Sequence, residues 1–238
     1  MVSTMLSPSP QSKRTPELTT YNNTADCIER ALLEDGHRMW GFVIYRCAYD
    51  NNDAAWLRLL QALRRYARQT LAYYHGLDLL DGFQLTVVED EAKFSGASTS
   101  AVRDHFREWA SAPDTVAREQ GGAEVKPGLS QRYRYCIRVD AEALNHVSAA
   151  MDEGEEGSNG DLGEEEDEIY VDLIWKDWEP SVPHPREKPM EAIEGCTRPD
   201  VGWMRVGIRG VMVEMYEALR DPNAWYGEYR RPYEVVCR

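Results

Sequence analysis

The stretch Trp40-Gly-Phe-Val-Ile-Tyr-Arg-Cys-Ala-Tyr49 combines aromatic and β-branched residues and is bounded by Gly41 and Asp50. This composition favours a strand in the interior of a sheet. A long helix is expected next, because Asp53 can cap a segment whose apolar residues recur at helical spacing. The members of this apolar stripe are Trp56, Leu59, Leu60, Leu63, Ala67, Leu71 and Tyr74.

Further segments of strand character follow along the chain, at residues 83–88, 133–139, 169–175 and 203–208. Helices are predicted between and after them, one capped by Ser98 or Thr99, a short one capped by Asp140, and a last one over 211–219. Because the strands alternate polar with apolar residues, they suit a sheet with one solvated face. We therefore predict an α+β fold, a mixed or antiparallel sheet with helices on one face in a ferredoxin-like sandwich. The order of strands and helices in the first half leaves a parallel α/β sheet as the alternative.

The chain of 238 residues can form one domain with tails. Residues 1–35 begin with a segment rich in Ser, Thr and Pro that has no apolar core, and we predict that they form a disordered lead. Residues 36–238 are expected to form a single domain. Within it, residues 152–168 carry ten acidic residues, four glycines and no basic residue, which is typical of an acidic flexible loop. The formal net charge of −14 is therefore concentrated in this loop.

Several common classes of protein are not indicated. No apolar run is long enough for a membrane span, and the motifs GxxxxGK[ST], GxGxxG and GxSxG are missing. The five cysteines are scattered, without the spacing of a zinc site or a disulfide framework. Cys47 and Cys136 lie in strand-like segments and are interpreted as small hydrophobic residues. The sequence predicts a cytoplasmic protein with no cofactor and no metal.

The long helix carries a cluster of arginines, Arg58, Arg64, Arg65 and Arg68. Arg58 and Arg65 share a face, and Arg64 and Arg68 stack one turn apart. One interpretation is a ridge that contacts the phosphates of an RNA backbone. The other is a solvated helix face whose arginines pair with the carboxylates of the chain itself.

Glu191 and Glu194 are the strongest candidates for a functional site. They stand beside Gly195 and Cys196, between a proline-rich loop and the apolar segment 203–208. A nearby pair of carboxylates can hold an ammonium or a guanidinium group. It can also divide into one acid and one base, because each charge shifts the pKa of the other. The plainer interpretation is that both are polar loop residues.

Several stretches together resemble a large family of filamentous-fungal proteins: Trp40-Gly-Phe-Val-Ile-Tyr-Arg46, Gly96-Ala-Ser-Thr-Ser-Ala-Val-Arg103, Tyr133-Arg-Tyr-Cys136 and Glu194-Gly-Cys-Thr197 with Val201-Gly-Trp203. The resemblance covers residues 38–236 and extends to the arginine-containing cyclodipeptide synthases. It implies an enzyme of fungal secondary metabolism that takes arginyl-tRNA and a second aminoacyl-tRNA and joins their amino acids as a diketopiperazine. An aminoacyl ester is already activated, so such an enzyme needs no ATP motif. Neither DNA nor a membrane is an expected partner.

These synthases are associated with an acidic motif of the form DDxxE, whose nearest match is Met190-Glu191-Ala-Ile-Glu194. The resemblance implies that Glu191 and Glu194 carry catalysis and arginine binding, and that the four arginines meet the tRNA. Met190 departs from the motif, since a thioether cannot replace an acid. Two alternatives follow: a catalytically silent member of the family, or a non-catalytic protein-interaction protein. The second amino acid and the oligomeric state are not indicated by the sequence.

Overall fold

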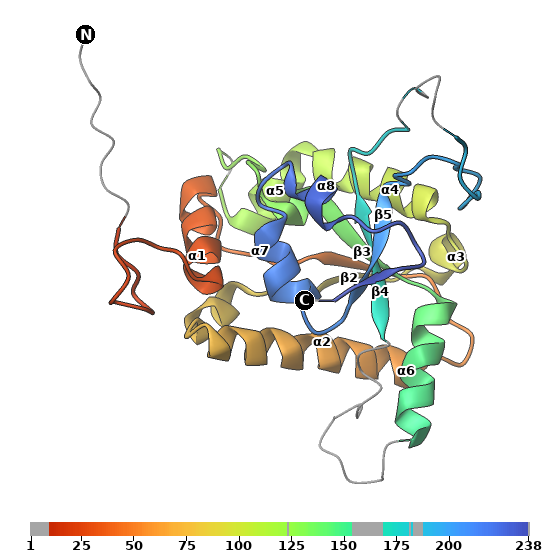
Figure 1. Cartoon of the computed structure of the whole chain (residues 1–238), viewed down its shortest axis with the longest axis horizontal. Coiled ribbons are helices and arrows are strands. Elements are labelled where there is room, and N and C mark those ends of the chain that lie inside the picture. The colour runs from red at the N-terminus through yellow and green to blue at the C-terminus, as the bar shows by residue number, and fades with distance from the viewer. Residues whose placement is uncertain (1–9, 123, 154–168, 181, 183–187, 238) are drawn as a thin grey trace.

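The computed structural model describes residues 10–122, 124–153, 169–180, 182 and 188–237. A six-stranded sheet with the strand order β2-β1-β3-β4-β5-β6 forms the centre of the molecule, and helices pack against it (Figure 1). The strands are β1 (Val43–Arg46), β2 (Thr86–Val88), β3 (Tyr135–Val139), β4 (Tyr170–Trp175), β5 (Trp203–Gly207) and β6 (Val235–Val236).

The sheet is mixed. β1 pairs in parallel with β2 on one side and with β3 on the other, and β6 pairs in parallel with β5. The pairs β3–β4 and β4–β5 are antiparallel. The predicted α+β fold with a mixed sheet is therefore confirmed. The strand order differs from a ferredoxin-like sandwich, because the first three strands are joined by long helical crossovers that make them parallel.

Helices cover both faces of this sheet, where the sequence predicted one. The helical elements are α1 (Thr24–Asp35), α2 (Asp53–Tyr73), η1 (Leu77–Gly82), α3 (Glu91–Phe94), α4 (Thr99–Ser111), α5 (Pro113–Gln120), η2 (Gln131–Tyr133), α6 (Ala141–Glu153), η4 (Val211–Met215), α7 (Tyr216–Ala218) and α8 (Ala224–Glu228). One core lies between the sheet and α1, α2, α6 and the η4–α8 region. The second core lies on the other face, under α3, α4 and α5.

The burial of the strands explains why helices cover both faces. The consecutive residues Ile44 and Tyr45 of β1 are both completely buried, one in each core. Some polar residues that suggested a wet face are also buried. Asp172 on β4, for example, is 3% exposed. A charged side chain can be buried when it is paired, so the alternation of polar and apolar residues does not mark a solvated surface here.

The N-terminal region is a second correction, because residues 24–35 of the predicted disordered lead form helix α1. Asn23 caps this helix by accepting a hydrogen bond from the backbone N–H of Asp26. Ala25 and Ile28 are buried in the first core. The preceding segment is tied to the helix by Arg14, whose guanidinium lies 2.9 Å from the Asp26 carboxylate. Residues 1–9 of the lead and residues 154–168 of the predicted acidic loop lie outside the described residues.

Within the described ranges, no helix combines the length and the apolar character needed to cross a bilayer. The connection between β4 and β5, residues 176–202, holds the predicted acid pair, and its described part around Glu194 lies beside the start of α4 (Figure 1).

Candidate functional site

The centre of the sheet has the topology that produces ligand sites in open sheets. The crossover from β1 to β2 runs through α2 and packs in the first core. The crossover from β2 to β3 runs through α3, α4 and α5 and packs in the second core, on the opposite face. In doubly wound sheets whose first three strands have the order 2-1-3, as here, ligands bind at the carboxyl ends of the first and third strands. In this chain that place is the end of β1 and β3, at residues 46–47 and 138–140.

A row of charged side chains crosses the sheet at this place. Arg138 of β3, Asp172 of β4 and Arg205 of β5 stand directly opposite one another in the strand register. The Arg138 guanidinium donates to Asp172 Oδ2 at 2.7 Å and, through Nε, to the carbonyl of Ala97 at 3.0 Å. We refer to Arg138, Asp172 and Arg205 as the polar row.

Asp172 is the acid of the polar row, and its pKa is strongly shifted. Burial raises its pKa to about 7, and the carboxylates of Asp140 and Glu194 act in the same direction, while Arg138 and Arg205 act against it. Its second oxygen, Oδ1, is buried and has no hydrogen-bond partner among the described residues. A carboxylate in this condition can hold a donor group of a ligand or accept a proton near neutral pH.

Glu194 lies at the tip of a small hairpin formed by residues 190–197. Ile193 and Cys196 exchange both backbone hydrogen bonds, at 3.0 and 2.9 Å. The two residues of the turn, Glu194 and Gly195, have φ angles of 46° and 80°. Two consecutive positive φ angles are typical of a type I′ hairpin turn. Glycine accepts this conformation without cost, but glutamate does not.

Contacts of the Glu194 carboxylate connect the hairpin to the N-terminus of α4. One carboxylate oxygen accepts from the backbone N–H of Thr99 at 3.2 Å, and the other contacts the Thr99 hydroxyl. The positive end of a helix favours a carboxylate at this place. Ser98 caps the same helix, as the sequence predicted. Because Ala97 also binds Arg138, the start of α4 joins Glu194 to the polar row.

Glu191 lies apart from Glu194. It is exposed, and it lines a hollow of 290 Å³ together with Met190, Arg231 and Tyr233. Glu194 lines a different hollow, of 400 Å³, beside Trp178. Neither of these two hollows, which are formed by described residues, contains both carboxylates.

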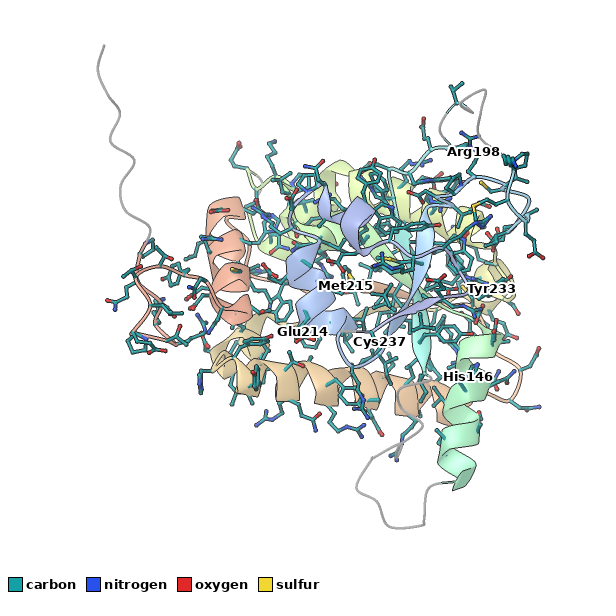
Figure 2. The ribbon with its side chains drawn as sticks, viewed as in Figure 1. His146, Arg198, Glu214, Met215, Tyr233 and Cys237 are labelled. Atoms are coloured by element: carbon teal, nitrogen blue, oxygen red, sulfur yellow. The ribbon has the colours of Figure 1, made fainter. Side chains whose placement is uncertain are left out.

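Arg205 connects the polar row to the hollow beside Glu191. Its guanidinium lies between two aromatic rings, 4.2 Å from the centroid of Tyr170 and 4.5 Å from that of Tyr233. It also donates to Glu142 at 2.6 Å. Tyr233 is labelled in Figure 2, on the side of the molecule that also holds Arg198 above it and His146 of α6 below it. Stacked and paired in this way, Arg205 is a fixed positive charge beside Asp172.

The predicted arginine cluster lies on α2. The apolar side of α2 packs in the first core, so the cluster lies on the face of the sheet opposite to α4 and the hairpin. Arg64 and Arg68 are exposed and line a hollow of 270 Å³ with Phe83 and Leu85. Arg65 is half-buried and its guanidinium lies 4.8 Å from the ring centroid of Tyr66. Arg58 is half-buried as well. The hollow of Arg64 and Arg68 is distinct from the hollows described for Glu191 and Glu194.

The cysteines of the strands behave as predicted. Cys47 and Cys136 are buried, and burial raises the pKa of the Cys47 thiol to about 12. A thiol with such a pKa is protonated at neutral pH and is a poor nucleophile.

The sequence interpretation missed the polar row. Its signal was present as a single charged residue inside each of three apolar strands, at positions 138, 172 and 205. In the part of the chain that the structure describes, no group of three His, Cys, Asp or Glu is arranged to hold a metal ion. Comparisons with protein-family models, with curated proteins and with solved structures found no match to this chain.

Proposed function

We propose that this chain is a tRNA-dependent cyclodipeptide synthase, which joins arginine to a second amino acid as a diketopiperazine. The observation that supports the proposal is the buried carboxylate of Asp172, with one unpartnered oxygen, at the carboxyl ends of β1 and β3. Glu194 lies close enough to influence its pKa. This is an acidic site for a cationic substrate, at the position where open sheets bind ligands.

The reaction needs a group that accepts a proton. The α-ammonium of one aminoacyl group must lose a proton before its nitrogen attacks the ester carbonyl of the other. A new C–N bond forms, the ester C–O bond breaks, and the ribose oxygen of the tRNA leaves with a proton. Repetition of the attack within the dipeptidyl ester closes the ring. A carboxylate with a pKa near 7 is suited to take the proton at neutral pH, and this is the role that we propose for Asp172.

Glu194 is the proposed partner of the cationic substrate. Its carboxylate already lies beside the hollow of 400 Å³ and is oriented by Thr99. A carboxylate can hold either cationic group of an arginyl substrate, its α-ammonium or its guanidinium. Glu191 is assigned the weaker role of a charge at the neighbouring hollow.

The proposed tRNA contact is the exposed part of the arginine cluster on α2. Arg64 and Arg68 are one turn apart and both reach the surface. They can contact phosphates at some distance from the acidic site, because a tRNA is much larger than this domain. The contact is electrostatic and should weaken with salt.

The test is a reaction of the purified chain with arginyl-tRNA and a mixture of the other aminoacyl-tRNAs, followed by mass spectrometry. We expect a cyclic dipeptide that contains arginine, strongly reduced product for Asp172→Asn and Glu194→Gln, and a smaller effect for Glu191→Gln. Glu124→Gln is the matched control, since Glu124 is exposed and outside the site. If no diketopiperazine forms while the tRNA stays charged, the proposal is wrong.

One observation favours the catalytically silent alternative. The bonds from Thr99 to Glu194 are also explained as stabilisation of the N-terminus of α4. Met190, which lines the hollow beside Glu191, can be changed to Asp to restore the acidic motif. A gain of product in Met190→Asp over an inactive parent would identify a decayed enzyme.

A further inference from the structure

A fourth hollow lies at the carboxyl end of β4, three residues beyond Asp172. It has a volume of 340 Å³ and is formed by the end of β4, the residues that follow it, Asp200 and α8. Three aromatic and three acidic side chains line it: Trp175, Trp178, Tyr226, Asp177, Glu179 and Asp200. We refer to it as the aromatic pocket.

The rings of the aromatic pocket are held in place by the fold. Trp175 and Tyr226 meet edge to face, with centroids 6.0 Å apart. Trp178 stacks on the guanidinium of Arg103 at 4.9 Å, and Arg103 itself donates to the carbonyl of Gly202 at 3.0 Å. Gly202 has a φ of 76°, and a Cβ at this position would lie 2.4 Å from the Trp178 ring. The close approach of Trp178 therefore depends on this glycine.

The carboxylates provide the second part of the pocket. Asp200 is fixed, because Oδ1 accepts from the backbone N–H of Gly202 at 2.7 Å and Oδ2 from the Trp225 indole at 2.9 Å. Asp177 and Glu179 are exposed at the rim, and Asp177 also meets Lys176 at 3.2 Å. The pocket thus combines aromatic surface with an excess of negative charge.

We propose that the aromatic pocket binds the guanidinium group of a ligand. A guanidinium is flat, is weakly hydrated, stacks on indole and phenol rings, and directs several N–H donors to carboxylates in its plane. A quaternary ammonium group has no donors for the three carboxylates, and an alkylammonium is compact and strongly hydrated. The packing of Arg103 on Trp178 is the same interaction inside the protein.

Trp178 also lines the hollow that contains Glu194, so the two hollows meet at this ring. The assignment of the pocket to the arginine side chain of a substrate rests on the proposed function. The binding of a guanidinium group does not, and it can be measured without any reaction.

The experiment is a titration of the full chain with n-propylguanidinium, followed by calorimetry and by the indole N–H signals in NMR spectra. The matched ligand n-butylammonium has the same charge and similar length. The variants are Tyr226→Ala, whose ring is 67% exposed and so is not needed for the core, and the double variant Asp177→Asn with Glu179→Gln. Glu124→Gln is the control for loss of a carboxylate elsewhere.

We expect saturable binding of n-propylguanidinium with one site and weaker binding of n-butylammonium. Tyr226→Ala should raise Kd about two- to fivefold, the double acidic variant about three- to tenfold, and Glu124→Gln should leave it unchanged. The inference is overturned if no saturable binding occurs, if the pocket variants bind like the parent, or if n-butylammonium or tetramethylammonium binds as tightly. A chain that binds n-propylguanidinium but forms no diketopiperazine contradicts the proposed function alone. Product formation without guanidinium binding contradicts this inference alone.

Discussion

The buried carboxylate of Asp172 gives the sharpest test of the site, through the substitution Asp172→Asn. Two effects compete at this residue. Burial disfavours its charge, whereas Arg138, 2.7 Å away, favours it. Burial is the larger effect and raises the pKa to about 7. Asparagine keeps the shape of the side chain but cannot ionise, so the difference between the two proteins isolates the titration of this group.

The sign and size follow from linkage. An acid whose pKa is higher in the folded than in the unfolded state, where the ordinary value is 3.8, is protonated preferentially when folded. Its contribution to stability is complete below pH of about 4 and is lost as the pH rises to about 7. The slope reaches about 1.4 kcal/mol per pH unit. Between pH 5 and pH 7, the unfolding free energy of the wild type should therefore fall by about 2 kcal/mol relative to Asp172→Asn, because the slope decreases as the pH approaches the folded-state pKa.

The assay is urea unfolding of both proteins at pH 5, 6, 7 and 8, with Glu124→Gln as a control that should follow the wild type. The reasoning is refuted if the unfolding free energy of the wild type, relative to that of Asp172→Asn, stays constant or rises with pH. Either result would mean that Arg138 offsets or outweighs burial. If the asparagine variant does not fold, the ¹³C signal of the Asp172 carboxyl in the wild type gives the same answer. A midpoint below pH 5 contradicts the argument.

Two further outcomes are expected. Gly202→Ala should lower the free energy of unfolding by about 2 kcal/mol or more, because its φ of 76° and the Trp178 ring 2.4 Å from a Cβ both oppose a side chain. Chemical denaturation measures this loss, and a loss below about 0.5 kcal/mol contradicts the prediction. Arg64→Ala with Arg68→Ala should weaken tRNA binding and reduce the slope of log K against log salt by up to about 2, which filter binding at several salt concentrations measures. Arg118→Ala on α5, on the other face, is the control and should leave the slope unchanged.

The parts of the fold that sequence could predict were those with a regular period. The stripe of α2, from Trp56 to Leu71, is buried as expected, and β1 to β5 lie where the composition placed strands, whereas β6 was not predicted. The second layer of helices was not predicted, because residues such as Arg138 look solvent-facing in sequence. In the structure their charges are paired inside the protein, and only three-dimensional contacts reveal this. Helix α1 was missed for a related reason, since its burial depends on tertiary packing.

The candidate site was predicted in part. Glu194 was found from its place beside Gly195-Cys196, but its supposed partner Glu191 lies at another hollow. Glu194 instead acts electrostatically on Asp172, which is 22 residues earlier in the chain. Sheet register brings Asp172 beside Arg138, and a single sequence carries no record of that register. A lone charge inside an apolar strand was the available signal.

The conformation of Glu194 separates a functional from a structural role. A left-handed φ of 46° costs an L-residue about 1–2 kcal/mol relative to the right-handed region. The hydrogen bonds to Thr99 offset this cost, since hydrogen bonds to charged groups stabilise a protein by about 1.5–3 kcal/mol. Glu194→Gly removes both effects, and Ser98 still caps α4. We therefore expect the free energy of unfolding to change by about 1 kcal/mol or less.

If Glu194 binds the substrate, Glu194→Gly should abolish product formation while stability is kept. Glu194→Asn is the companion variant, because asparagine tolerates the left-handed conformation and offers a neutral amide in place of the carboxylate. Loss of product in both variants, with unchanged urea midpoints, would show that the Glu194 side chain is needed for the reaction and not for the fold. Loss of more than about 2 kcal/mol of stability, with activity falling only in proportion to the folded fraction, would instead mean that this carboxylate serves the helix.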